Sequence, residues 1–169
     1  LGGDFVPLAT PGQLLDTRTG VGAPAGLRGG GSVTSFQALG RGGVPASGVS
    51  AVLADISVIN PTVGTYLTIW PDGSTRPPVS MLNAASGDVL SNTAVVPVGT
   101  SGLLNLGNQS GDTHLLVEVH GYYLSAPSTS TGTGGFVPVP SQRLVDTRTG
   151  TGGVPVGTIP ANGTRTVTI

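Results

Sequence analysis

The 169-residue sequence predicts an all-β protein, an antiparallel β-sandwich with a jelly-roll-like arrangement of about eight to ten strands. Three observations carry this prediction. Short apolar runs alternate with polar residues at a period of two, which is the period of a strand. The 29 glycines and 14 prolines fall between those runs, as turn residues do. Helical periodicity is not sustained anywhere in the chain.

The first predicted strands in chain order are residues 32–39 and 50–59. In the second of these, apolar residues alternate, which indicates a face turned toward a core. That face consists of Val52, Ala54, Ile56 and Val58. Asn60-Pro61 ends the segment, because proline has no amide hydrogen to donate to a β-ladder.

Four further predicted strands are residues 65–70, 89–98, 102–106 and 113–124. Turn residues separate them, for example Pro71-Asp72-Gly73 after the first. The last strand alternates most regularly of all. One of its faces carries Thr113, Leu115, Val117 and Val119, and the other carries His114, Leu116, Glu118 and His120.

The chain contains the same opening segment twice. Residues 5–8 and 14–20 (Phe-Val-Pro-Leu and Leu-Leu-Asp-Thr-Arg-Thr-Gly) return as residues 136–139 and 144–150 (Phe-Val-Pro-Val and Leu-Val-Asp-Thr-Arg-Thr-Gly). The two phenylalanines are 131 positions apart and the two aspartates 130, so one residue is lost between them. A weaker echo relates residues 22–26 to residues 153–157. Such self-similarity is the mark of modular arrays.

The repeat divides the chain into three parts. Residues 1–124 are predicted to be one complete β-sandwich repeat, and residues 136–169 the opening segment of a second. Between them, residues 125–135 contain only small, mostly polar residues, which is typical of a flexible tether. We expect the second opening segment to dock on a sheet of a neighbouring subunit, since it carries apolar residues without a partner sheet of its own. The alternatives are that it folds back onto its own module or that the sequence stops inside a longer array.

The composition argues against several classes of partner. Charged residues make up 9% of the chain, the net charge is −1 and no lysine is present, so a basic surface for nucleic acid or anionic membrane is missing. No apolar stretch reaches the length of a membrane span. The absence of cysteine removes disulfides and thiolate metal sites.

Asp16 and Arg18 of the repeated motif, with Asp146 and Arg148 in the second copy, are the most distinctive polar residues. If they lie two apart on a strand, they point to the same face and can pair. The guanidinium group offers five donors in a rigid fork, which suits the fixing of glycine-rich loops. We therefore predict that they are structural anchors. The alternative is an Asp/Arg pair that binds a ligand such as a sugar or a carboxylate.

Tyr66, Thr68 and Trp70 share one face of the strand at residues 65–70. Exposed aromatic side chains at this spacing can stack on sugar rings, which makes Tyr66 and Trp70 candidate ligand-binding residues. The interpretation we favour is that they form the second buried face of a sandwich strand.

The sequence predicts no metal, no cofactor and no catalytic residue. Glu118 and His120 are near enough to chelate one ion, but nothing close in sequence supplies a third ligand. No Gly-x-Ser-x-Gly elbow is present, and the glycine-rich residues 28–32 lead into a strand and not into a helix. The chain is therefore predicted not to be an enzyme.

Several ordered motifs resemble a repeat found in large secreted proteins of actinobacteria, which begins Leu-Leu-Asp-Thr-Arg and ends Val-Asp-Val-x-Gly-Tyr-Tyr. The matching segments of this chain are residues 43–45, 48–52, 64–71, 117–123 and 143–150. Glu118 stands where that ending has Asp. The resemblance implies an extracellular, cell-surface or cell-wall-associated module, found in tandem or appended to secreted enzymes, and it supplies no catalytic residues.

Two functions are thus predicted from the sequence. The first is a non-catalytic extracellular structural or adhesive module, whose partners are other copies of itself, assembled in tandem or head to tail through the C-terminal segment. The second is a module that binds cell-wall or extracellular polysaccharide through Tyr66 and Trp70, as an accessory domain of a secreted hydrolase.

Overall fold

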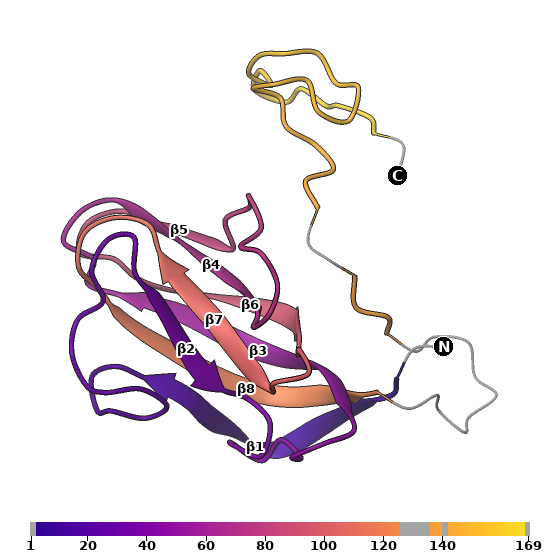
Figure 1. Ribbon diagram of the computed structural model, residues 1–169. Helices are drawn as coiled ribbons and strands as arrows, with labels where there is room; N and C mark the ends of the chain where they lie inside the picture. Colours follow the sequence, from indigo (N-terminus) through magenta and orange to yellow (C-terminus); the bar gives the residue numbers. More distant parts are fainter. Residues whose placement is uncertain (1–2, 126–135, 140–141, 168–169) are drawn as a thin grey trace. The chain divides into compact units, whose positions relative to one another are not determined.

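The computed structural model describes residues 3–125, 136–139 and 142–167, which belong to two compact units (Figure 1). The sandwich unit comprises Leu1–Arg76 and Ser80–Val139, and the C-terminal unit comprises Pro77–Val79 and Pro140–Ile169. Of the predicted linker, all but its first residue lies outside the described residues. That residue, Ser125, donates its backbone N–H to the carbonyl of Gly48 at 2.8 Å.

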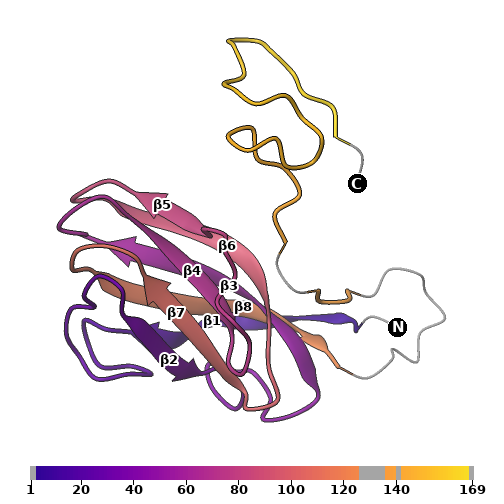
Figure 2. The same cartoon turned by 45° about the horizontal axis from the view of Figure 1, so that its top comes forward.

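The sandwich unit consists of two packed four-stranded antiparallel sheets (Figure 2), so the predicted β-sandwich is confirmed. In order across the first sheet lie β1 (Phe5–Asp16), β8 (His114–Leu124), β3 (Val49–Ile59) and β6 (Val89–Pro97). In order across the second lie β2 (Val33–Gln37), β7 (Leu103–Asn108), β4 (Thr65–Pro71) and β5 (Leu82–Ala84).

The strand pairing shows how the chain is wound. β1 pairs with β8, β2 with β7, β3 with β6 and β4 with β5, and all four pairs are antiparallel. The first strand thus pairs with the last, the second with the one before it, and so on toward the middle of the chain. The chain therefore folds as one long double-stranded hairpin that wraps over both sheets. This is the jelly-roll arrangement that the sequence predicts.

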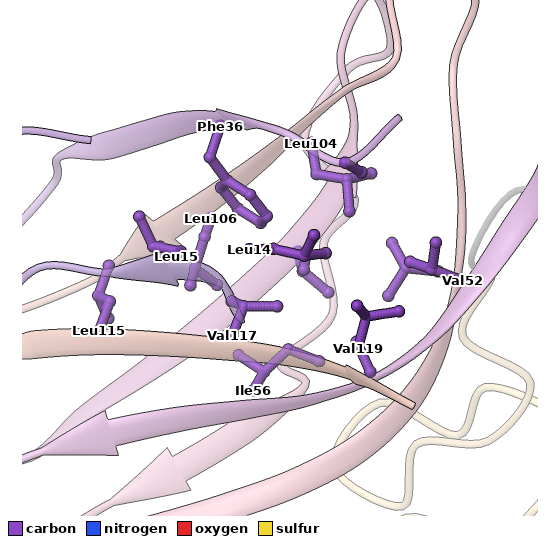
Figure 3. Packing of buried hydrophobic residues seen from close by; sticks show 14 of the residues in the cluster. Leu14, Leu15, Phe36, Val52, Ile56, Leu104, Leu106, Leu115, Val117 and Val119 are labelled. Atoms are coloured by element: carbon purple, nitrogen blue, oxygen red, sulfur yellow. The ribbon is translucent and has the colours of Figure 1, made fainter. Parts of the chain in front are cut away.

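The core lies between the sheets, and β3 and β8 contribute more residues to it than any other strands (Figure 3). The predicted inner face of β3, Val52, Ala54, Ile56 and Val58, is completely buried. Leu115, Val117 and Val119 of β8 are buried to the same degree, as are Leu104 and Leu106 on the opposite sheet. Alternation along these strands puts every second side chain into the core, which is why the period of two located them correctly.

β1 and β5 are strands that the alternation did not reveal. β1 has a bulge, because Pro7 is opposite Gly121 and Gly12 is opposite Val119, and the bulge interrupts the period of two. β1 is also an edge strand, where the prolines at positions 7 and 11 are tolerated. β5 has only three residues and is too short to show a period.

The C-terminal unit differs from the prediction of opening strands for a second repeat. Its described residues contain turns and one isolated bridge, between Asp146 and Thr151, but no strand. A strand needs a neighbour to which its amides and carbonyls can bond. In the first copy β8 is that neighbour for β1.

Thr34 on β2 provides a test of the packing between the sheets. The residue is 6% exposed, and its hydroxyl has no hydrogen-bond partner among the described residues. Burying an unpaired hydroxyl costs free energy, so Thr34→Val, which keeps the shape of the side chain, should raise the free energy of unfolding by about 1 kcal/mol. Chemical denaturation measures the change.

Thr113→Val is the matched control. The Thr113 hydroxyl is also buried, but it donates to the carbonyl of Ile59 at 2.9 Å. Its removal should lower the free energy of unfolding by about 1 kcal/mol. Equal effects of the two substitutions would contradict the assignment of Thr34 as unpaired.

Candidate functional site

The repeated motif forms a closed turn directly after β1. Asp16, the last residue of the strand, is only 2% exposed. Its carboxylate accepts three hydrogen bonds from Arg18: from the backbone N–H to Oδ1 at 2.9 Å, from Nε to Oδ1 at 3.0 Å and from Nη2 to Oδ2 at 2.8 Å. The last two form the bidentate fork typical of Arg–carboxylate pairs. The Arg18 side chain is 45% exposed.

The backbone of Asp16 closes the same turn. Its carbonyl accepts from the amides of Thr19 at 3.3 Å, Gly20 at 2.9 Å and Val21 at 3.1 Å, and its own amide donates to the carbonyl of Val21 at 2.9 Å. Gly20 adopts a φ of +87°, a conformation that residues with a side chain rarely adopt. Asp16 and Arg18 were expected to pair along one strand face. That geometry is wrong, because the turn, and not the strand, brings Arg18 back to the carboxylate.

Thr17 fixes this turn to the sheet, a role that the sequence analysis missed. The residue is completely buried, and its amide donates to the carbonyl of Leu115 at 3.0 Å. Its hydroxyl accepts from the amide of Leu115 at 2.9 Å, and its carbonyl accepts from the amide of Gly26 at 2.8 Å. Thr17 therefore holds β8 on one side and the loop that follows the motif on the other.

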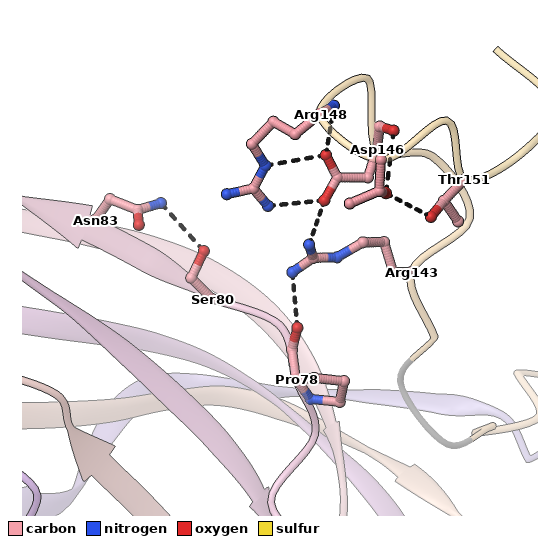
Figure 4. A network of polar contacts seen from close by, with 8 residues as sticks. Pro78, Ser80, Asn83, Arg143, Asp146, Arg148 and Thr151 are labelled. Carbon is pink, nitrogen blue, oxygen red and sulfur yellow. Dashed lines mark hydrogen bonds and ion pairs between the residues drawn. The ribbon is translucent and has the colours of Figure 1, made fainter. Parts of the chain in front are cut away.

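The second copy forms the same turn within the C-terminal unit (Figure 4). Asp146 is 7% exposed, and its carboxylate accepts from the backbone N–H, Nε and Nη2 of Arg148 at 2.9, 3.0 and 2.7 Å. The carbonyl of Asp146 accepts from Gly150 at 2.8 Å, and that of Thr147 accepts from Gly157 at 2.8 Å. Each of these bonds has its counterpart in the first copy. A further donor to the carboxylate is Arg143, which occupies the position of Gln13.

The surroundings of the two turns are different. Leu14 and Leu15, which precede the first turn, are completely buried in the sandwich core. Their counterparts Leu144 and Val145 are 53% and 40% exposed. The turn has the same hydrogen bonds in both settings, so its conformation follows from the motif's own residues and not from the packing around it.

Arg–carboxylate bonding also governs the protonation of the two aspartates. The side-chain hydrogen bonds from Arg18 are the main reason that the pKa of Asp16 lies below its ordinary value, and they outweigh the opposing effect of burial. Hydrogen bonds from the side chain of Arg148 lower the pKa of Asp146 in the same way, with a further contribution from Arg143. Both carboxylates are therefore ionised well into the acidic range.

The two candidate sugar-stacking residues lie on the outer side of β4. Trp70 is only 7% exposed, whereas Tyr66 is half-buried. Arg76 lies over both rings, with its guanidinium carbon 5.9 Å from the centroid of Tyr66 and 5.7 Å from that of Trp70. Arg76 also contacts this face through Thr68, to whose hydroxyl its Nη2 donates at 3.4 Å. The aromatic pair is thus covered by an intramolecular cation.

The two histidines of β8 have separate partners. His120 Nε2 lies 3.1 Å from Oδ2 of Asp55, and His114 Nδ1 lies 3.1 Å from the Thr17 hydroxyl. Among the described residues, no group of three or more His, Cys, Asp or Glu side chains could hold a metal ion. The same part of the chain contains no helix long and apolar enough to cross a membrane.

Comparison with protein-family models and with curated proteins found no match for the chain.

Asp16→Asn tests the anchoring role of the first turn. The substitution keeps the shape of the side chain but places an amide group opposite Arg18, so a charge-assisted hydrogen bond is lost at a buried position. We expect the free energy of unfolding to fall by about 1–3 kcal/mol at neutral pH. Asp146→Asn is the matched control, since its turn lies outside the sandwich unit, and it should leave the main unfolding transition unchanged.

The pH dependence provides a second, independent prediction. The pKa of Asp16 in the folded protein lies below the ordinary value of 3.8, so its ionised form stabilises the fold above that pH. This stability is lost as the pH falls through the folded-state pKa. The wild-type protein should therefore lose more stability than Asp16→Asn between pH 6 and pH 3, measured by thermal or chemical denaturation. Parallel pH profiles would contradict the assignment.

Proposed function

We propose that the chain is a non-catalytic structural or adhesive module of an extracellular, cell-surface or cell-wall-associated protein, used in tandem copies. The main support for this proposal comes from the hydrogen bonds of the repeated Asp-Thr-Arg-Thr-Gly motif. Asp16 and Arg18 bond to each other and to their own turn, and Asp146 and Arg148 do the same. A duplicated motif that is committed to internal hydrogen bonds supports a building block and not a duplicated ligand site.

The composition of the chain supports the same proposal. Only 9% of the residues are charged, and several Ser, Thr and Asn side chains bond to neighbouring strands. A sandwich held in this way contains no thiol that could be oxidised, since the chain lacks cysteine. Such a module suits an extracellular environment. The resemblance to repeats of secreted actinobacterial proteins supports the same location.

Surface exposure in the source organism tests this function directly. An antibody raised against residues 3–125 should bind intact cells, and brief protease treatment of those cells should remove the signal. A cytoplasmic marker protein is the control for cell lysis. Signal that is found only after lysis would contradict an extracellular location.

A polysaccharide-binding experiment separates the module from the alternative function. With Trp70 7% exposed and Arg76 over both rings, we expect no saturable binding to cell-wall polysaccharides in a pull-down or glycan array. Trp70→Ala should therefore leave the result unchanged. Saturable binding that is lost in Trp70→Ala and kept in Tyr122→Phe would instead support the carbohydrate-binding alternative.

Head-to-tail assembly is the remaining part of the proposal. Leu144 and Val145 of the C-terminal unit expose apolar surface that their counterparts Leu14 and Leu15 bury. Apolar segments next to unpaired backbone groups are readily taken up by a sheet edge of another molecule. A repeated contact of this kind between identical chains gives a ring or an open filament.

Removing residues 126–169 tests the assembly. The full chain should form concentration-dependent oligomers in sedimentation or light-scattering measurements, and the truncated chain should remain a monomer. Leu144→Ser/Val145→Ser should weaken assembly in the full chain. A truncated chain that assembles as well as the full one would contradict the role of the C-terminal segment.

A further inference from the structure

Three aromatic side chains meet where β1 begins and β8 ends. The ring centroid of Tyr123 lies 5.0 Å from that of Phe5 and 4.6 Å from that of Phe136. Both distances fall in the range of favourable aromatic pairs, and both pairs are tilted. Phe5 and Phe136 are the same position of the repeated sequence. Tyr123 thus contacts the first aromatic residue of its own copy and that of the following copy.

The backbone makes a second connection at the same place. The amide of Gly3 donates to the carbonyl of Phe136 at 3.1 Å, and the amide of Phe136 donates to the carbonyl of Gly3 at 3.2 Å, which forms an isolated antiparallel bridge. Next to it, the amide of Leu124 donates to the carbonyl of Asp4 at 3.0 Å. Residues 136–139 accordingly belong to the sandwich unit, although the sequence repeat assigns them to the second copy.

Two glycines leave the space that this arrangement needs. A Cβ atom on Gly3 would lie 1.6 Å from the carbonyl oxygen of Leu124, and one on Gly121 would lie 2.4 Å from Cζ of Phe5. Neither approach is possible for a residue with a side chain. The close packing of Gly3 on β8 places its backbone in reach of Phe136, and Gly121 makes room for the Phe5 ring that contacts Tyr123.

We propose that Gly3, Tyr123 and Phe136 form a joint between consecutive copies of the repeat, whose partner surface is the first strand segment of the following copy. This inference rests on the tandem arrangement in the proposed function. The joint holds residue 136 beside residue 3, so the start of the next copy has a fixed position on the previous one. Because Phe136 is the counterpart of Phe5, the same contacts can recur at each junction of an array.

The position of Phe5 fits a recurring joint. Its side chain is 41% exposed even though it contacts Tyr123. In an array, the counterpart of Tyr123 in the preceding copy would contact Phe5 as Tyr123 contacts Phe136. An exposed aromatic residue at the first position of the module is therefore the surface on which a preceding copy docks.

Amide hydrogen exchange measured by NMR on the full chain tests the joint. In the wild-type protein, the amide of Phe136 should exchange more slowly than an unstructured peptide of the same sequence. Tyr123→Ala removes the ring that Phe136 contacts, and loss of one aromatic pair should speed exchange at Phe136 by about 2- to 10-fold. Tyr123→Phe keeps the ring and should keep the wild-type rate.

Tyr66→Ala is the matched control, because it makes the same change on the other sheet and should leave exchange at Phe136 unaffected. Leu115 is an internal reference for global stability. Because Tyr123→Ala also removes the contact with Phe5, exchange at Phe136 is compared with exchange at Leu115 within each variant. If Phe136 exchanges at the rate of the free peptide in the wild-type protein, or at equal rates in wild type and Tyr123→Ala, the joint does not exist. The cell-surface experiment does not depend on this contact. The joint and the proposed function can therefore each be refuted without refuting the other.

Discussion

The pairing of β3 with β8 forms the centre of the first sheet. The two strands run side by side from Val49 opposite Leu124 to Ile59 opposite His114, and each has a further strand on its other side. Their inner faces are completely buried at alternate positions. Burial of apolar area on this scale is the main favourable contribution to folding. β1 and β6 then add to the two sides of this pair, and the second sheet packs over its inner face.

Glycine-rich loops impose a further constraint on the fold, because their backbone groups need hydrogen-bond partners when they are buried. Single buried polar side chains provide several partners at once. The side-chain amide of Asn108 donates to the carbonyls of Arg28 at 3.0 Å and Gly111 at 2.8 Å, and its oxygen accepts from the hydroxyl of Thr65 at 2.7 Å. Asn108 is completely buried and so connects three separate segments. Asp16 and Thr17 likewise bond to several groups at once in the loop that follows β1. In a chain without cysteine, the side-chain hydrogen bonds of these residues connect the segments that disulfides could otherwise connect.

Prediction from the sequence succeeded where a residue's role follows from local pattern. The alternation located β3 and β8 and their inner faces, because a period of two is a direct consequence of strand geometry. It did not reveal β1, since the bulge between Pro7 and Gly12 interrupts the period. The sequence also drew attention to Asp16 and Arg18 through their repetition. Thr17, which is repeated equally well, was overlooked because its role depends on Leu115, 98 positions away in the chain.

The conformation of the repeated motif follows from the local sequence. Asp16 and Asp146 organise the same turn in different surroundings, because the donors to each carboxylate lie at most three residues away. The contacts of that turn and of the aromatic residues depend instead on how the whole chain folds. It buried Leu14 and Leu15, placed Arg76 over Trp70, and brought Phe136 to Tyr123 and Gly3. These contacts join residues that are distant in the chain, and local pattern contains no information about which distant surfaces will meet.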